Sequence, residues 1–244
     1  MRSDQHLDYL LQQWPFEPDS LCVRILKGAD GRDVLQLRVD LGILQLETTG
    51  RPDGLRPEGH ATMLDMLCQR ESENPDFELD EESCVEIDRE FVQFYHRRVA
   101  WLRLQRFEAA VCDADHTLAL MDFCREHSPC EEWTLQHEQH RAFVIFHRSQ
   151  AAALAAIEEG AAEDAVEAIN DGLMQIEDNF EEMGWADAFE SDELVCRLNE
   201  LRDSLRADFH IGKSLKEQFE EAVQTEQYEL AAELRDQLAR RDSD

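Results

Sequence analysis

The chain has 244 residues, 43% of them hydrophobic, which is enough for one or two ordinary cores or for an extended helical array. Its 55 acidic and 24 basic side chains give a formal net charge of −31. Such a field repels nucleic-acid phosphates, anionic lipid heads and anionic cofactors at long range, so we expect no direct nucleic-acid binding, no membrane binding and no cofactor.

The start of the chain lacks the pattern of an export signal, and no apolar run reaches the roughly 20 residues that span a bilayer. We therefore expect a cytoplasmic protein. An odd number of cysteines without paired spacing indicates reduced thiols, most of them small buried hydrophobes. These cysteines are Cys22, Cys68, Cys84, Cys112, Cys124, Cys130 and Cys196.

Residues 1–80 are expected to begin with a short amphipathic helix. Apolar residues recur with helical spacing between Leu7 and Trp14, Ser3 is a candidate cap, and Pro15 ends the pattern.

The pattern then changes to that of a small antiparallel sheet. Apolar and polar residues alternate over 35–40, which predicts a strand with one apolar and one wet face. A turn at 28–31 joins it to an earlier strand in a hairpin over about 21–39, and Leu44 and Leu46 indicate a third strand.

Two stretches with few hydrophobic residues follow the sheet. Glycines and prolines mark 50–59 as a linker or an ordered loop, and 69–83 has the composition of an acidic connector. We therefore expect a domain boundary near residue 80. Apolar residues beyond it follow helical spacing, which predicts a helical domain over 81–211.

Within this body, residues 98–120, RVAWLRLQRFEAAVCDADHTLAL, resemble a tetratricopeptide repeat. Trp101 stands where the first helix of the repeat carries an aromatic, Phe107 opens the second helix, and Ala110 fits the small position where the helices cross. The resemblance implies a helical hairpin.

A weaker copy spans 151–176, with Gly160 in the turn and Ala165 at the crossing. The copies lie about 55 residues apart, whereas a tandem array of this repeat has a period of about 34. We expect two long hairpins that are similar to tetratricopeptide units without forming a regular superhelix. Generic antiparallel helices remain the alternative.

Another helix is expected after Ser191, its candidate cap, and Gly212 then breaks the chain. The remainder, 212–244, predicts two short helices over about 214–225 and 227–240. Apolar positions share a stripe on each helix. The stripes comprise Leu215, Phe219 and Val223 on the first, and Tyr228, Ala231, Ala232, Leu234 and Leu238 on the second.

Adjacent alanines in the second helix predict a close crossing between the two helices. At Ala231 and Ala232 a larger side chain would force the hairpin open, and Tyr228 is expected to fill the space beside the turn. Arg235 and Asp236 fall near the open end, able to pair with each other or with a partner. A hairpin this short has too little core to be stable alone, so its own chain, a second copy or another protein must cover its apolar face.

Residues 214–241 resemble the UVR motif, the helical hairpin at the end of the repair helicase UvrB, within UvrC, and in Clp-linked regulators such as McsA. The family's hairpin mediates association between proteins, so the resemblance implies an interaction module. The partner-binding positions that it implies are Phe219, Tyr228, Glu229, Ala231, Ala232, Leu234, Arg235, Asp236 and Leu238. Two departures are Val223, where alanine is common, and Glu226, where many members are apolar.

The segment LQLRVDLGILQLETTGRPDGLRP, from residue 35 to 57, also resembles the opening of uncharacterised bacterial proteins that carry a C-terminal UVR motif. The P-loop of UvrB and any nuclease signature of UvrC are missing from the sequence.

One cluster has the residue types of a metal site. Thiolate and imidazole groups near a helix turn could converge on Zn²⁺, but the spacing matches no zinc module and lacks a CxxC pair. Buried thiols and solvated or core histidines are the favoured interpretation, and we expect no metal. The cluster comprises Cys124, His127, Cys130, His137 and His140.

Catalytic patterns are weaker still. Cys112 and His116, four residues apart on one helix, could be a nucleophile and a base, but a buried cysteine beside a polar-face histidine is the simpler interpretation. Acidic pairs such as Glu158 and Glu159 are expected to be solvated helix faces.

The sequence as a whole predicts an α+β protein that is mostly helical, with a non-enzymatic role as an adaptor or scaffold. The expected partner is a protein, with UvrB, UvrC or a Clp-system component suggested by the resemblance. A metal-dependent regulator and a self-associating structural protein, such as a homodimer, are the alternatives.

Overall fold

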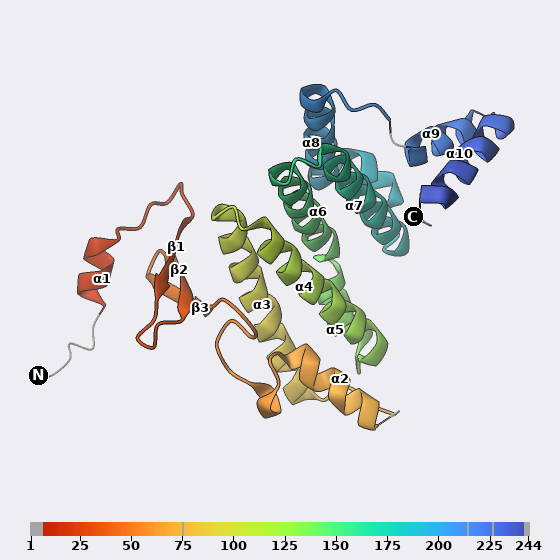
Figure 1. The fold of residues 1–244 in the computed structure, drawn as a ribbon. Coiled ribbons are helices and arrows are strands. Elements are labelled where there is room, and N and C mark those ends of the chain that lie inside the picture. Colours follow the sequence, from red (N-terminus) through yellow and green to blue (C-terminus); the bar gives the residue numbers. More distant parts are fainter. Residues whose placement is uncertain (1–6, 75, 214, 226, 242–244) are drawn as a thin grey trace, which may run out of the picture.

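The computed structural model of the chain describes residues 7–74, 76–213, 215–225 and 227–241, with the backbone alone at 215–216, 220–221 and 238–241. It has the mostly helical α+β architecture that the sequence predicts, with one three-stranded antiparallel sheet (Figure 1). Its elements are α1 (Asp8–Gln13), β1 (Cys22–Lys27), β2 (Asp33–Val39), β3 (Gly42–Glu47), the 3₁₀ helix η1 (Pro57–Gly59), α2 (Met63–Glu73), α3 (Glu81–Arg103), α4 (Phe107–His127), α5 (Glu131–Glu138), α6 (Arg141–Glu158), α7 (Ala162–Glu182), the 3₁₀ helix η2 (Ala186–Ser191), α8 (Glu193–Phe209), α9 (Leu215–Gln224) and α10 (Tyr228–Arg241).

The sheet is a meander with β2 in the centre. Leu35 lies opposite Ile25 of β1 and opposite Leu46 of β3. Leu37 occupies the same face two residues later, so one face of β2 is apolar, as the alternation predicts.

The second face of β2 was expected to be wet, and that expectation is wrong, because Gln36 and Arg38 are both buried. The segment that ends α1 covers this face: the Arg38 Nε donates to the Trp14 carbonyl (2.8 Å), and the Arg24 guanidinium lies 4.1 Å from the centre of the Trp14 ring. Gln36 accepts a hydrogen bond from Arg24 Nη2 at 2.7 Å. Polar side chains are tolerated here because each finds a partner.

The apolar face of the sheet shares a core with α3, α4 and α6. Leu35, Leu37 and Leu46 pack with Trp101 and Ala110, among others, so the hydrophobic core crosses residue 80. Arg97 of α3 adds polar contacts to the same junction. Its Nη1 donates to the carbonyl of Gly50 (2.7 Å), and its Nε and Nη2 bond the carboxylate of Asp113.

Helix α2 begins after the expected loop over 50–59 and ends within the stretch 69–83 that was expected to be an acidic connector. Thr62 caps it by accepting a hydrogen bond from the Asp65 amide at 3.1 Å. Met63, Met66 and Leu67 are buried against α3 and α4. A helix forms here because these residues, although few, lie on one face that the later helices cover.

Two antiparallel helical hairpins, α3–α4 and α6–α7, form the body, and α8 packs on α7 and α6 (Figure 1). The α6–α7 turn contains Gly160 at φ 79°, and Ala165 is fully buried at the start of α7. Helix α8 is capped by Asp192, whose carboxylate accepts from the Leu194 amide, so the expected cap at Ser191 is wrong by one residue. The candidate cap Ser3 lies outside the described residues.

The cysteines are free thiols, but they are less buried than expected. Cys124 is buried, and burial raises the pKa of its thiol. Four others occupy outward helix positions or a helix start and are exposed: Cys68, Cys112, Cys130 and Cys196. Within the described ranges, none of the helices combines the length and apolar character needed to cross a bilayer.

Candidate protein-binding hairpin

Helices α9 and α10 pack on each other through a very small core. Ala222 and Ala231 are 2% and 6% exposed, and Leu234 lies beside them with Phe219 at the edge. Two alanines at the crossing let the helix backbones approach closely. The turn is closed by a hydrogen bond of 2.7 Å from the Gln227 amide to the Ala222 carbonyl.

The alanine that faces α10 is Ala222, one residue before the predicted stripe position Val223. Val223 is 45% exposed. Ala222 and Val223 are the third and fourth residues after Phe219, and residues at both spacings lie beside Phe219 on a helix, so helical periodicity alone could not choose between them. The close approach of α10 places the smaller side chain, that of Ala222, at the crossing. The second departure from the motif, Glu226, lies outside the described residues.

On α10, only one of the two adjacent alanines contributes to the crossing. Ala231 is buried, whereas Ala232 is exposed because successive residues of a helix differ by about 100° in direction. Tyr228 also differs from expectation, since it is 68% exposed and does not fill space beside the turn.

These outward residues form a stripe. Tyr228, Ala232 and Arg235 follow one another at spacings of four and three residues, which places them on one side of α10. Arg235 Nη2 donates to Asp236 Oδ1 of the same helix at 2.9 Å, and both side chains are exposed. We refer to Tyr228, Ala232, Arg235 and Asp236 as the outer stripe.

The other partner-binding positions that the resemblance implies lie partly on the surface of the hairpin and partly in its core. Glu229 is exposed, whereas Phe219, Ala231 and Leu234 belong to the core of the hairpin. The Leu238 side chain lies outside the described residues.

A family model described as the UvrB/uvrC motif matches residues 213–240. This hairpin is a UVR motif. No curated protein and no solved structure matches the chain. The family match covers the hairpin and does not extend to the sheet or to the helical body.

The UVR motif is tied to the body near its first helix. Helix α8 ends at His210, whose φ of 57° is left-handed and turns the chain away from the helix axis. Arg206 of α8 then pairs with Glu217 of α9, with both side chains 20% exposed.

The five metal candidates do not converge. Among the described residues, no three histidine, cysteine or carboxylate side chains lie close enough together to hold a metal ion. His137 lies in α5 and His140 precedes α6, so the two do not share a helix as expected. Cys124 is buried in an apolar core, and Cys130 is exposed at the start of α5.

His127 and His137 have other surroundings. The His127 ring lies 4.4 Å from the Phe123 ring, and His137 Nε2 lies 3.0 Å from Asp88 Oδ1. These two side chains are therefore held by ring packing and by a carboxylate contact.

The expectation of a buried Cys112 beside a solvent-facing His116 is wrong, because the two environments are reversed. Cys112 is exposed, whereas His116 stacks on Phe94 with ring centres 3.9 Å apart and has its Nε2 2.9 Å from Glu90 Oε1. Glu90, fully buried, also accepts the amide of Met63 at 2.8 Å and so holds the start of α2. This part of the molecule is a buried polar network that sequence spacing could not reveal.

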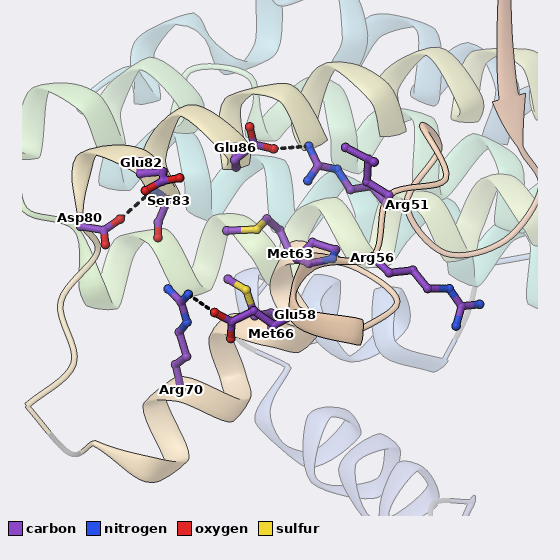
Figure 2. A pocket seen from close by; sticks show the side chains of 12 residues that line it. Arg51, Arg56, Glu58, Met63, Met66, Arg70, Asp80, Glu82, Ser83 and Glu86 are labelled. Carbon is purple, nitrogen blue, oxygen red and sulfur yellow. Dashed lines mark hydrogen bonds and ion pairs between the residues drawn. The ribbon is translucent and has the colours of Figure 1, made fainter.

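A pocket of about 610 Å³ lies between the 51–66 segment, α2 and the start of α3 (Figure 2). Two of its three arginines are engaged by acids of the lining: Arg51 pairs with Glu86 at 2.7 Å, and Arg70 pairs with Glu58 at 2.6 Å. Four carboxylates face these three arginines, so the pocket has no excess of positive charge that would select an anionic ligand.

Proposed function

We propose that the protein is a non-enzymatic adaptor that binds a protein partner through its UVR motif. The observation that carries this proposal is the division of apolar residues within the hairpin. Its small core uses Ala222, Ala231 and Leu234, while Tyr228 and Val223 remain largely exposed. Exposed aromatic residues beside an arginine are typical of the central contacts in protein interfaces.

The stability of the hairpin gives a second argument. A hairpin of two short helices buries too little apolar area to offset the entropy of ordering both of them. A partner that covers the outer stripe would add apolar contact to Tyr228 and could accept hydrogen bonds from Arg235 in exchange for its bond to Asp236.

The pathway is proposed from the motif alone. By resemblance the partner belongs either to excision repair, as UvrB or UvrC, or to Clp-type proteolysis. A net charge of −31 disfavours direct contact with DNA, so a role in repair would act through a protein. We place the protein in the cytoplasm, which its free cysteines favour.

We further propose that the helical body is a tetratricopeptide-like scaffold. The proposal is supported by the presence of Trp101 and Ala110 in one buried core, with the aromatic on α3 and the small residue on α4. In that case the body would orient the UVR motif toward its partner.

The test is direct binding of the full chain to purified UvrB, UvrC and McsA, measured with the chain immobilised. We expect binding to at least one of them, and the double variant Tyr228→Ala/Arg235→Glu should bind about tenfold or more weakly, because both changes remove outer-stripe contacts. The control is Glu233→Ala/Gln237→Ala, which alters exposed positions on other sides of α10 and should bind as the unmodified chain does.

Equal loss in both double variants would contradict a role for the outer stripe. Self-association is tested in the same samples by light scattering. A dimer that Tyr228→Ala/Arg235→Glu converts to a monomer, with no binding to the three proteins, would replace the adaptor with a self-associating protein.

A further inference from the structure

A groove of about 760 Å³ runs over the helical body, far along the chain from the UVR motif. It lies between α3 on one side and α5 with the start of α6 on the other, with α4 beneath. Gln136, Gln139 and His140 stand at its rim. Its apolar lining comprises Phe91, Val92, Tyr95, Met121, Phe143 and Val144.

Arg98 lines this groove although its side chain is 1% exposed. Its Nη1 donates to Thr117 Oγ1 at 3.0 Å, and its Nε donates to His147 Nδ1 at 3.3 Å. Both acceptors are neutral groups. Among the residues that the structure describes, none brings a carboxylate within ion-pair distance of this guanidinium.

Among the described residues, one other buried arginine, Arg38, also lacks a carboxylate, but its guanidinium donates to main-chain carbonyls, those of Trp14 and Gly42 among them. The remaining buried arginines pair with acids: Arg97, the neighbour of Arg98, bonds Asp113, Arg51 bonds Glu86, and Arg141 bonds Glu138. The carboxylate of Asp113 is therefore already engaged. In a chain with more than twice as many acidic as basic residues, a buried cation without its own carboxylate is unexpected, since burying an uncompensated charge is costly.

Arg98 keeps its charge at neutral pH. Burial lowers the pKa of Arg98 to about 10, which leaves it protonated. Burial and the nearby Arg98 charge lower the pKa of His147 to about 4, so this imidazole is neutral and able to accept. The groove therefore has a fixed positive charge at one end.

The acidic residue of the groove lies at its other end. Asp88 precedes Arg98 by ten residues, which separates them by about 15 Å along α3. Asp88 also accepts a hydrogen bond from Trp133 Nε1 at 3.0 Å and lies 3.0 Å from His137 Nε2. The Asp88 carboxylate is thus distant from Arg98 and already engaged by hydrogen-bonding groups of α5.

We propose that this groove binds a small organic monocarboxylate with an aromatic or branched apolar body, whose carboxylate pairs with Arg98. The apolar body would pack against the surface formed by Tyr95 and Phe143, whose ring centres are 6.2 Å apart, and against Met121. A groove of this size, mostly apolar with one buried cation and one distant, hydrogen-bonded carboxylate, has the composition of a small-molecule site.

The overall negative charge of the protein does not prevent this binding. Exposed charges are screened over about 8 Å at physiological salt, whereas the pair between a carboxylate and a buried guanidinium is screened much less. Net charge therefore slows the approach of the ligand, and the local cation determines its position.

The test measures calorimetric binding of 4-phenylbutyrate and its neutral amide, 4-phenylbutyramide, to the full chain. We expect the acid to bind about tenfold or more tightly than the amide, because only the acid forms a charged pair with Arg98. Arg98→Met, which fills the same volume without charge, should remove that preference.

A second pair of variants covers the case in which Arg98→Met does not fold. Val92 lines the groove and Val85, two turns earlier on α3, does not, and both are exposed. Val92→Trp should block the groove and abolish binding of the acid, whereas Val85→Trp should leave it unchanged. The proposal is wrong if the acid does not bind, if acid and amide bind equally, or if Val92→Trp binds as Val85→Trp does.

Discussion

Gly172 lies on α7 opposite Ser149 of α6. A Cβ atom at this position would come within 1.9 Å of Ser149 Oγ and 2.6 Å of Ser149 Cβ. Neither distance is attainable, so the absence of a side chain allows the two helices to pack. Glycine is unfavourable within a helix, and the sequence alone gives no reason for it at this position. The reason is Ser149 on the opposite helix, which occupies the space that a side chain at residue 172 would need.

Gly172→Ala should therefore destabilise the fold by about 1–3 kcal/mol, because α6 and α7 must move apart. Urea unfolding measures the change. Gly42→Ala is the control, since a Cβ there meets nothing within 4 Å. Replacing Ser149 by glycine in the Gly172→Ala background should recover part of the loss, and an unchanged stability of Gly172→Ala would refute the close crossing.

His147 makes stability depend on pH. Its pKa falls from 6.5 to about 4 in the folded state, first because of burial and then because of the Arg98 charge. Between these values the unfolded chain binds a proton that the folded chain does not. Stability is therefore lost as the pH falls from about 6.5 to about 4, and this contribution is constant below and above that window.

Replacing His147 by asparagine keeps an acceptor near Arg98 and removes the titration. Between pH 7 and pH 4.5, the unmodified chain should lose roughly 2 kcal/mol more free energy of unfolding than His147→Asn does. Urea titrations at the two pH values provide the comparison. The same pH dependence in both proteins would show that His147 is not the responsible group.

At the scale of the element, two adjacent alanines of α10 have different environments, one in the core of the hairpin and one on its surface. Ala231 meets α9, and Ala232 belongs to the outer stripe. The two positions are identical in residue type and adjacent in sequence, so a matched pair of substitutions distinguishes their roles.

Ala231→Leu should force α9 and α10 apart, whereas Ala232→Leu should leave the hairpin folded because its side chain points outward. Hydrogen exchange of the full chain measures this difference. We expect amide protection in α9 and α10 to decrease in Ala231→Leu alone. Equal protection in the two variants would contradict the crossing at Ala231.

For the molecule as a whole, Arg97 links parts of the chain that the sequence assigned to separate domains. It bonds Asp113 within the helical body and the carbonyls of Glu47 and Gly50 next to the sheet. The core of the sheet is continuous with that of α3, α4 and α6. Whether residues 1–80 also fold separately stays a prediction about the isolated segment.

Arg97→Met should lower stability by about 3–5 kcal/mol, because it leaves the Asp113 charge buried and unpaired. The double variant Arg97→Met/Asp113→Leu should recover much of that loss, since both charges are then gone. Urea unfolding gives both values. The exposed pair of Arg197 and Glu193 supplies the control, and Arg197→Ala should change stability by less than about 1 kcal/mol.

The sequence alone determined the features that depend on local spacing. The alternation in β2, the long amphipathic helices and the two-helix UVR motif all follow from residues a few positions apart, because strand and helix periodicity is a property of a short segment. These features were sufficient to predict the fold class and a protein-binding hairpin.

Tertiary structure decided the features that depend on residues far apart in the chain. The buried polar face of β2 requires Trp14, the network around Glu90 joins α2 to α4, and the choice of Ala222 over Val223 depends on the position of α10. Arg98 is the clearest case, because its sequence neighbours are those of any helical arginine. Its lack of a carboxylate arises only from the packing of α3, α4 and α6, and burial makes that lack energetically important.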